Sequence, residues 1–544
     1  MSDAIVLVGL SGSGKSTVGK AVAERLGRPF RDLDALLEAE HGGSPAALID
    51  RHGEGHFRGL EASVVAAACR EPGAVVATGG GAVIDPLNRW ILWEAGTVFW
   101  LDAADRQLLD RLAADDTERP LLRGGPAALA DLRAGRDAFY RAADIRLDAS
   151  APVAATVHAV LEAIAARAEA ATDRAPARRL FDAQVPRDHP MGPATARIVL
   201  GYALDAPTLG PILKGAGSGA PLVVADRRAA RALPGLMDAI PPERRILMVA
   251  GERRKRLRAA EQLLEAASAL GAERSDAWIG VGGGTTTDLV GTAAALYLRG
   301  APFVALPTTW LGMADAAIGG KVAVDLSVAK NAAGAFWPPV AVVGDVAALA
   351  SLPRARRLDG MAECLKGGLI GDPALWDLVE SRGRAAIRHD EAARFAIVER
   401  AVRLKLGVVA RDPFERGERR TLNLGHTLGH ALEVESGYRL PHGQAVVLGL
   451  RAVAAIAARR GAEPSLPERI DTVLSTLGYA LRRDFDAAVV RAAMSRDKKR
   501  HQGRQRWILP MAVGRVSEVD DVTDAELALA LRTIASSTSG ILAA

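Results

Sequence analysis

The chain has 544 residues, of which 49% are hydrophobic and 24% charged, the balance of an ordinary globular protein. Its length predicts about three or four structural domains. The net charge of +5 is small, and basic and acidic residues are mixed in stretches such as 252–265, which disfavours a nucleic-acid-binding surface.

The cysteine content and the N-terminus predict a cytoplasmic protein. Cys69 and Cys364 are the only two cysteines, too few for a disulfide framework and typical of a reducing compartment. The run Ala4–Val8 lacks a basic flank and is expected to be a buried strand, not a signal peptide. No stretch approaches the roughly 20 apolar residues of a membrane span, so no membrane association is expected.

Residues 1–166 alternate short apolar runs with helical patterns, which predicts a parallel α/β sheet covered by helices. The expected strands are Ala4–Val8, Val75–Thr78 and Val98–Leu101. Residues 167–196 are rich in Ala, Arg, Asp and Pro without a sustained period and are interpreted as a linker.

A second α/β domain is expected over residues 197–352, and amphipathic helices dominate residues 353–544. Its strand candidates are Arg197–Leu200, Leu222–Val224, Ile246–Val249, Trp278–Val281 and Phe303–Leu306. The fold class is therefore α/β, with a mostly helical domain at the end.

The segment Gly9–Thr17 follows an apolar strand, opens a helix and has the full G-x-x-x-x-G-K-S pattern. Its backbone N–H groups can surround phosphate oxygens at a helix N-terminus. Lys15 can reach the terminal phosphates, and the Ser16 hydroxyl can bind Mg²⁺. A purely structural glycine turn is the less favoured alternative.

Further polar groups indicate an acceptor site. Asp32 and Asp34 place two carboxylates on one side of a segment expected to be extended, suited to Mg²⁺ and to an acceptor hydroxyl. Arg58 and the triple glycine 79–81 follow. Residues 117–122 have the character of a lid that carries an arginine, and Arg136 is expected to open a later helix.

These motifs in this order resemble shikimate kinase, a phosphate-loop kinase with a parallel sheet. The resemblance implies that ATP with Mg²⁺ phosphorylates shikimate. It implies an ATP and Mg²⁺ set of Gly12, Gly14, Lys15, Ser16, Thr17, Asp32 and Arg119, with Ser16 and Asp32 serving the metal. It implies a shikimate set of Asp34, Arg58, Gly80 and Arg136, with Lys15, Asp34 and Arg119 as catalytic residues.

Three histidines lie within seventeen residues of each other in the C-terminal half. His426 and His430 are four apart and share a helix face, and His442 follows. Glu363 and Lys366 form an i, i+3 pair on another predicted helix. Glu363, His426 and His442 together would make a three-ligand zinc site with one open position, although a histidine pair alone is more often structural.

The segment Gly282–Asp288 follows a strand and opens a helix, so it could bind a dinucleotide pyrophosphate. A structural turn is nearly as plausible for this pattern alone. Pro307–Thr309, Gly319–Lys321 and Lys330–Asn331 add polar groups in predicted loops.

These features, with Tyr297–Gly300, Glu363-x-x-Lys366, Lys405, Arg419, Asn423 and Arg496–Lys499, resemble 3-dehydroquinate synthase over residues 197–540. The resemblance implies a Rossmann-like domain followed by a helical metal-binding domain, in a homodimer. It implies conversion of 3-deoxy-D-arabino-heptulosonate 7-phosphate to 3-dehydroquinate and phosphate, with NAD and Zn²⁺ or Co²⁺ as cofactors.

The implied metal ligands are Glu363, His426 and His442. The implied NAD set is Asp226, Glu252, Lys255, Gly283, Gly284, Thr285, Asp288, Thr308, Thr309, Lys321 and Lys330. The implied substrate set is Arg299 (from a neighbouring subunit), Asp315, Lys321, Asn331, Lys366, Lys405, Arg419, Asn423, His430, Lys498 and Lys499. Asp315, Lys366, Lys405 and His430 are the expected catalytic residues.

The chain departs from the synthase pattern at a few positions, most of them on the nucleotide side. Thr287 stands where the family usually has glycine, Ala316-Ala317 replaces two serines, Asp325 replaces an asparagine, and Ala250 replaces an acidic residue. Two alternatives stay open for this half: a different sugar-phosphate cyclase, or a noncatalytic nucleotide-binding module. All expected ligands are small molecules.

Overall fold

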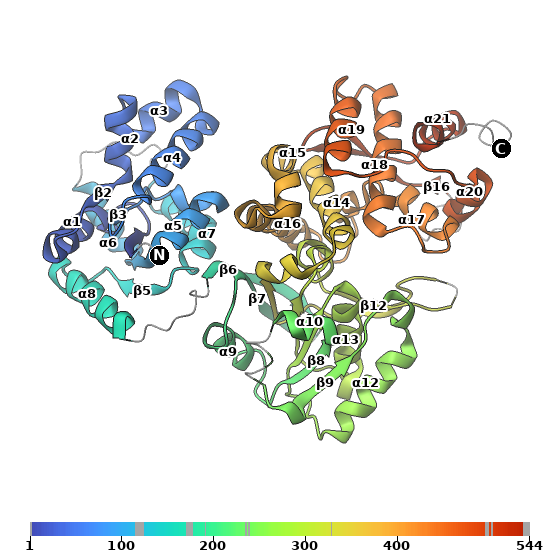
Figure 1. The fold of residues 1–544 in the computed structure, drawn as a ribbon, viewed down its shortest axis with the longest axis horizontal. Coiled ribbons are helices and arrows are strands. Elements are labelled where there is room, and N and C mark those ends of the chain that lie inside the picture. The colour runs from blue at the N-terminus through green and yellow to red at the C-terminus, as the bar shows by residue number, and fades with distance from the viewer. Residues whose placement is uncertain are drawn as a thin grey trace. The chain divides into compact units, whose positions relative to one another are not determined.

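The computed structural model describes residues 3–114, 124–169, 178–190, 192–233, 237, 240–327, 329–495, 500–501 and 504–536. The chain divides into two compact units. Unit 1 contains residues 1–184 and 197–204, and unit 2 contains residues 185–196 and 205–544. Each unit is described by itself (Figure 1).

Unit 1 contains a five-stranded parallel sheet in the order β2-β3-β1-β4-β5. The strands are β1 (Ala4–Val8), β2 (Phe30–Asp32), β3 (Val75–Ala77), β4 (Gly96–Asp102) and β5 (Ile145–Asp148). All five residues of β1 are buried, and Val6 pairs with Val76 on one side and Val98 on the other. A continuous apolar run is what a strand buried on both faces requires, so the predicted strands and parallel sheet are confirmed.

Helices surround this sheet (Figure 1). They are α1 (Lys15–Leu26), α2 (Leu33–His41), α3 (Pro45–His52), α4 (Glu54–Ala68), η1 (Ala82–Ile84), α5 (Pro86–Ala95), α6 (Asp105–Ala113), α7 (Gly125–Tyr140) and α8 (Val153–Glu169).

Two local predictions in unit 1 are wrong. Asp32 and Asp34 do not share an extended segment, because the Asp32 side chain accepts from the N–H groups of Asp34 and Ala35 and starts α2 as its N-cap. Arg136 does not open a helix but lies in the last turns of α7, which begins at Gly125.

The range expected to be a linker contains strand β6 (Arg178–His189) and the start of β7 (Gly192–Tyr202). Part of each strand belongs to unit 1. Within that unit, Arg89 Nε donates to the Leu180 carbonyl at 3.0 Å, and the Phe139 and Phe181 rings lie 6.0 Å apart. Leu180 and Phe181 are both buried. This short apolar pair makes the strand part of the packed unit, although the surrounding composition is typical of a linker.

A seven-stranded sheet has the order β6-β7-β14-β11-β10-β8-β9. Its other strands are β8 (Leu222–Asp226), β9 (Arg245–Met248), β10 (Trp278–Gly282), β11 (Phe303–Pro307) and β14 (Ala341–Asp345), which pair in parallel. The elements packed around them are α9 (Ala206–Lys214), α10 (Arg227–Ala232), η3 (Pro242–Arg244), η4 (Glu252–Arg254), α12 (Leu257–Ala269), α13 (Gly284–Leu296), η5 (Tyr297–Arg299), η6 (Gly312–Ala316) and the hairpin β12 (Lys321–Val324) to β13 (Ala333–Phe336).

The rest of unit 2 is mostly helical, as predicted. Its elements are η7 (Val346–Ser351), α14 (Arg354–Ile370), α15 (Pro373–Arg388), α16 (Glu391–Arg411), η8 (Glu418–Asn423), α17 (His426–Glu435), α18 (His442–Arg459), α19 (Leu466–Leu477), α20 (Ala487–Ser495) and α21 (Asp524–Ile534). Four short strands were not expected: β15 (Arg500–His501), β16 (Arg504–Gln505), β17 (Trp507–Ala512) and β18 (Arg515–Val519).

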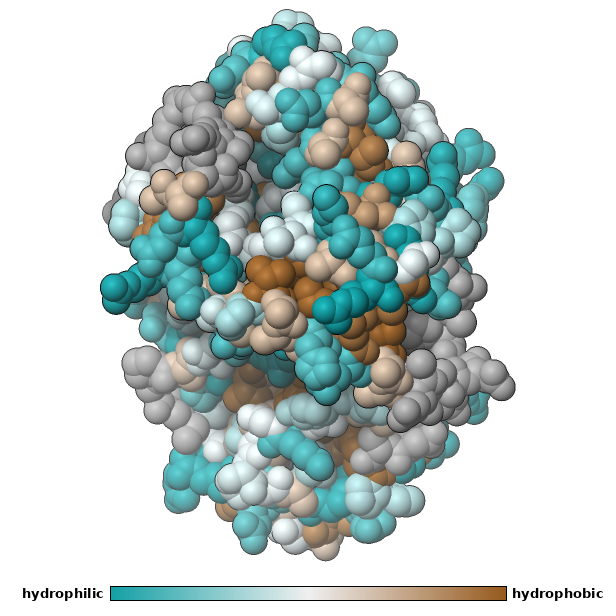
Figure 2. Space-filling model, turned by 90° about the vertical axis from the view of Figure 1, so that its left-hand side faces the viewer, coloured by the Kyte–Doolittle hydropathy of each residue, from teal (hydrophilic) through white to brown (hydrophobic). Residues whose placement is uncertain are grey.

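Hydrophilic side chains cover much of the face drawn in Figure 2, and apolar side chains form smaller groups between them. In the part of the chain that the structure describes, no helix combines the length and apolar character that a membrane span needs.

Candidate functional site

The predicted phosphate loop joins β1 to α1 at the carboxyl edge of the first sheet. Lys15 Nζ donates to the carbonyls of Gly9 and Leu10, both at 2.9 Å. Gly9 has φ 149°, and a Cβ there would lie 2.5 Å from the Leu101 carbonyl oxygen, so this position requires glycine. Four other residues predicted for ATP and Mg²⁺ lie in the same loop and the helix turn after it: Gly12, Gly14, Ser16 and Thr17. Asp32, also predicted for Mg²⁺, lies at the end of β2.

The triple glycine brings the predicted acceptor-binding residues together. A Cβ on Gly79 would lie 2.6 Å from Asp34 Oδ1. A Cβ on Gly80 would lie 3.2 Å from Arg136 Nη1, and one on Gly81 would lie 2.8 Å from Arg58 Nη1. One carboxylate and two guanidinium groups therefore converge on a backbone that leaves no room for a side chain. Guanidinium forks suit a substrate carboxylate, and the aspartate suits a hydroxyl.

Two residues at this site escaped the sequence analysis. Glu61 is buried and accepts from Arg58 Nη1 at 2.7 Å. Burial raises the pKa of Glu61, although Arg58 opposes the shift. Tyr140 is also buried, and its hydroxyl donates to the Gly80 carbonyl at 2.6 Å. The helical spacing of both residues could have identified them, because Glu61 lies three residues after Arg58 and Tyr140 lies four residues after Arg136.

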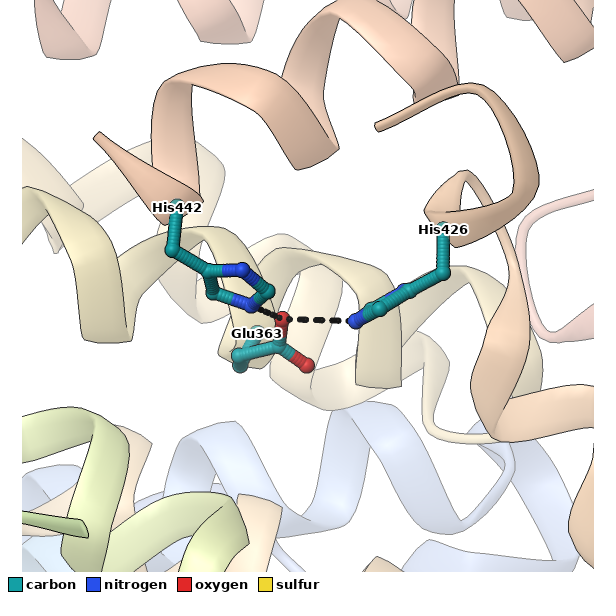
Figure 3. A group of neighbouring side chains, drawn as sticks. All are labelled: Glu363, His426 and His442. Atoms are coloured by element: carbon teal, nitrogen blue, oxygen red, sulfur yellow. Dashed lines mark hydrogen bonds and ion pairs between the residues drawn. The ribbon is translucent and has the colours of Figure 1, made fainter. Parts of the chain in front are cut away.

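In unit 2, three helices bring the predicted metal ligands together (Figure 3). Oε1 of Glu363 on α14 lies 3.4 Å from Nε2 of His426 and 3.2 Å from Nε2 of His442, at the starts of α17 and α18. The other ring nitrogens have separate partners: His426 Nδ1 lies 3.1 Å from the Leu424 carbonyl, and His442 Nδ1 lies 3.5 Å from Glu433. Both Nε2 atoms therefore face the carboxylate and are available to one metal ion.

Glu433 was not predicted, although its spacing offered a signal. It lies seven residues after His426 and three after His430. At this spacing the three side chains lie on nearly the same face of α17. Its buried carboxylate also lies 3.8 Å from Lys330 Nζ. The His430 ring lies 5.2 Å from that of His426, so the structure brings this predicted catalytic residue to the metal cluster.

A buried ion pair and a partly exposed one adjoin the cluster. Lys366 Nζ contacts Glu363, and Lys405 Nζ lies 2.5 Å from Asp315 Oδ1. Burial opposes the ionised form of Glu363, but Lys366 and His426 more than offset it and hold the pKa of Glu363 well below its usual value. Burial lowers the pKa of Lys405 despite the neighbouring carboxylate. An ionised carboxylate beside two imidazoles is a donor set typical of zinc.

Other predicted substrate residues are held by charges and carbonyls of neighbouring elements. Lys321 contacts Glu415, which also accepts from Asn423 Nδ2 at 3.0 Å. Arg419 Nη2 donates to the Gly319 carbonyl at 2.9 Å. Glu415 was not predicted, and sequence spacing gave no sign that it would meet both a loop lysine and an asparagine.

The glycine loop after β10 carries a connected set of charges. Thr285 Oγ1 donates to Glu252 at 3.2 Å, and Lys330 Nζ lies 3.2 Å from the same carboxylate. Lys255 Nζ contacts Asp288 and donates to Asn331 Oδ1 at 2.6 Å. Burial raises the pKa of Asp288 to about 6, although Lys255 opposes the shift.

Gly283 and Gly284 lie tightly against the next loop. Cβ atoms on them would lie 3.0 Å from Thr309 Cγ2 and 3.0 Å from Ala316 Cβ, respectively. Thr308 donates its N–H to the Gly282 carbonyl at 2.8 Å. These residues therefore belong to the same loop cluster at the carboxyl ends of β10 and β11.

The departures from the family pattern are accommodated. Thr287 is buried and its hydroxyl donates to the Gly284 carbonyl at 3.1 Å. Asp325 accepts from the Asn331 N–H at 2.7 Å, so it fixes the loop that carries Asn331.

Some predicted residues lie apart or outside the description. Asp226 ends β8, caps α10 and accepts from the Ala250 N–H at 2.7 Å. Arg299 lies exposed in η5, and no described hydrogen bond or ion pair joins it to the metal cluster. Arg119 with its predicted lid 117–122, Lys498 and Lys499 lie outside the described residues.

Comparison with known proteins matches two families to different parts of the chain. Residues 11–165 match the family model of shikimate kinase. Residues 245–359 and 360–500 match the models of the N-terminal and C-terminal parts of 3-dehydroquinate synthase.

Curated relatives cover the C-terminal half. A 3-dehydroquinate synthase of Xanthomonas campestris is 38% identical over 56% of this chain and 85% of its own length. The Thermobifida fusca 3-dehydroquinate synthase is 41% identical over 48% of this chain and 72% of its own. Among solved structures, 2-epi-5-epi-valiolone synthase of Streptomyces hygroscopicus, with NAD⁺ and Zn²⁺ bound, is 29% identical with a TM-score of 0.57, over 62% of this chain and 96% of that one. The chain therefore belongs to the 3-dehydroquinate synthase family and carries a shikimate kinase domain ahead of the synthase.

Proposed function

We propose that the chain catalyses two reactions of aromatic biosynthesis. The kinase half transfers a phosphoryl group from ATP to shikimate. The synthase half converts 3-deoxy-D-arabino-heptulosonate 7-phosphate to 3-dehydroquinate and phosphate. The observation that carries the second assignment is the convergence of Glu363, His426 and His442 beside a buried lysine, Lys366.

In the kinase half, the chain's own groups position the two substrates. Lys15 and Arg119 neutralise the transferring phosphoryl group, and the N–H groups of Gly12, Gly14 and Thr17 bind phosphate oxygens. Ser16 and Asp32 hold Mg²⁺. Arg58 and Arg136 bind the shikimate carboxylate beside Gly80, and Asp34 accepts the proton of the attacking hydroxyl.

The residues at the metal cluster fit a zinc or cobalt ion. Two Nε2 atoms and one carboxylate oxygen make the three-ligand, open arrangement of catalytic sites, and each Nδ1 has a partner that fixes its tautomer. A bound metal would polarise the oxygen atoms of the reacting alcohol and carbonyl. Glu363, His426 and His442 would hold it, with Glu433 orienting His442.

The nucleotide loop fits NAD, which would supply reversible oxidation of a ring alcohol. Gly283, Gly284 and Thr285 present N–H groups at the start of α13, where a pyrophosphate binds favourably. Further contacts come from residues around this loop: Asp226, Glu252, Lys255, Asp288, Thr308, Thr309, Lys321 and Lys330.

The remaining polar residues bind and deprotonate the substrate. Asp315, Lys366, Lys405 and His430 lie close to the metal cluster and are placed to hold or move protons. The substrate carboxylate and phosphate suit the basic and amide groups around them. These are Lys321, Asn331, Arg419, Asn423, Lys498 and Lys499.

The synthase half is proposed to form a homodimer in which Arg299 reaches the neighbouring subunit's site. The support is the surface around it: Leu296 is 55% exposed and Leu298 50% exposed, on either side of buried Tyr297. Adjacent exposed leucines are typical of a surface that another chain covers. The protein is proposed to act in the cytoplasm.

The deciding experiment measures phosphate release from 3-deoxy-D-arabino-heptulosonate 7-phosphate by the full chain, with and without NAD and a zinc chelator. Release that needs both cofactors and yields 3-dehydroquinate is the expected result. Absence of release, in a sample that phosphorylates shikimate, would contradict the synthase assignment. The similarity to 2-epi-5-epi-valiolone synthase supports one second candidate, a cyclase that acts on a different sugar phosphate. Phosphate release from a phosphorylated heptulose that lacks the carboxylate would support this second candidate.

A further inference from the structure

Unit 1 contains a cavity of about 350 Å³ that none of the predicted kinase residues lines. Its walls come from β4, the end of α7, β5 and the parts of β6 and β7 that belong to unit 1. This volume lies within the range of small-molecule sites.

The lining of the cavity is cationic. Arg141, Arg146, Arg179 and Arg197 face two aspartates, one of which, Asp182, is 3% exposed. The lining residues taken alone carry two more positive than negative charges, while Asp137 and Asp102, outside the lining, pair with Arg141 and Arg146. Guanidinium groups that surround a cavity bind carboxylates and phosphates through paired hydrogen bonds.

Only part of this hydrogen-bonding capacity is used inside the protein. Arg197 forms two hydrogen bonds to Asp182, at 2.9 and 2.7 Å. Arg179 Nε is buried and, among the described residues, has no partner. The described hydrogen bonds of Arg141 involve only its Nε, which contacts Asp137. Arg146 donates to Asp102 from Nε and Nη2, at 3.0 and 2.6 Å, and Arg179 Nη2 donates to the Ala143 carbonyl at 3.1 Å. The guanidinium donors that these bonds do not use remain for a ligand.

Tyr140 connects the cavity to the acceptor site. Its ring lines the cavity and stacks on Trp100 with centroids 6.0 Å apart. Its hydroxyl donates to the Gly80 carbonyl and contacts Arg136, two of the residues proposed to bind shikimate. A ligand that packs against this ring would hold the hydroxyl, and through it the acceptor loop.

We infer that this cavity binds a small organic or inorganic dianion, and that its occupancy strengthens acceptor binding by the kinase through Tyr140. A ligand that binds this form of the protein favours this form. By linkage, the acceptor must then strengthen binding of the dianion by the same factor. The second part of the inference rests on the proposed kinase activity, whereas the first does not.

Calorimetric titration of the full chain, with ADP and shikimate occupying the kinase site, tests the binding. Isophthalate and inorganic phosphate are the two probes, and the one that binds identifies the anionic group. The double variant Arg141→Gln/Arg146→Gln should weaken binding at least tenfold, because it removes the charged hydrogen bonds of two arginines to the dianion. Neither arginine holds the buried Asp182.

Arg106→Gln is the matched control, since Arg106 is exposed in the same unit and does not line the cavity. It should bind the probe as the parent chain does. No binding of either probe to the parent chain, or equal binding by the double variant, would overturn the site.

The coupling has its own readout. Saturating probe should lower the KM for shikimate about threefold or more and leave kcat unchanged, an effect near the lower end of typical coupling. Tyr140→Phe keeps the ring but removes the hydroxyl, so it should bind the probe and lose the KM effect. An unchanged KM in the parent chain would overturn the coupling and leave the binding result intact.

Discussion

Glu433→Gln removes one charge from the surroundings of the metal ligands and keeps the shape of the side chain. In the parent chain, the Glu433 carboxylate lies 3.5 Å from His442 Nδ1 and 3.8 Å from Lys330 Nζ. In the variant, Lys330 retains its ion pair with Glu252 at 3.2 Å, whereas no second described carboxylate contacts His442 Nδ1. The variant therefore acts mainly on His442, by loosening its orientation and lowering its basicity as a ligand.

Loss of such a partner typically weakens metal binding by about 10–100-fold. Because 3.5 Å is longer than a good hydrogen bond, we expect an effect near tenfold, which is about 1.4 kcal/mol. The assay is competition for Zn²⁺ between the purified chain and a chromophoric chelator, which reports metal affinity without turnover.

Glu435→Gln is the control, because Glu435 lies on the same helix and binds Arg483 at 2.9 Å instead of a metal ligand. Its zinc affinity should match that of the parent chain. Unchanged affinity in Glu433→Gln, or an equal loss in Glu435→Gln, would refute the role given to this carboxylate.

Three further predictions concern separate parts of the chain. Lys15→Met should lower shikimate phosphorylation at least about 100-fold, because it removes a charge at the transferring phosphate, while phosphate release by the synthase stays at the parent rate; loss of both activities would contradict it. The raised pKa of Asp288, about 6, means that the folded state binds the extra proton, so the free energy of unfolding should fall as pH rises from about 4 to about 6. In urea titrations across this range that slope should be reduced in Asp288→Asn, and equal slopes would refute the assignment. The proposed homodimer predicts that Leu298→Glu sediments as a monomer in sedimentation velocity, whereas Leu270→Glu, at another exposed leucine, sediments as the parent chain does.

The sequence predicted the elements that depend on local pattern. Buried strands such as Ala4–Val8 and Trp278–Gly282 are short runs without charged residues that lead directly into glycine loops, so their positions needed no knowledge of the partners. The three candidate metal ligands, which the structure brings together, could be picked out because two of them are close in sequence and the third precedes a lysine at helical spacing.

Errors and omissions arose where a distant contact decides the outcome. Asp34 lies in a helix because the Asp32 side chain caps the start of that helix. The periodicity of the sequence does not show whether the chain at Asp34 is extended or already helical. Glu415 meets Lys321 across 94 residues, and a surface-like glutamate gives no sign of such a partner. Strand β6 was missed because its apolar residues, chiefly the pair Leu180 and Phe181, are few among many charged ones.

The packing of that short apolar pair constrains how the two enzymes can be separated. A kinase ending at residue 166 would lose the Leu180 carbonyl, leaving buried Arg89 with one hydrogen bond fewer, and would uncover Phe139. Loss of one hydrogen bond to a buried charged group costs about 1.5–3 kcal/mol and an exposed phenylalanine about 1.5–3 kcal/mol, together comparable to much of a domain's net stability. A gene split at that point would thus yield a fragile kinase, so once fused, these two genes would not readily come apart again.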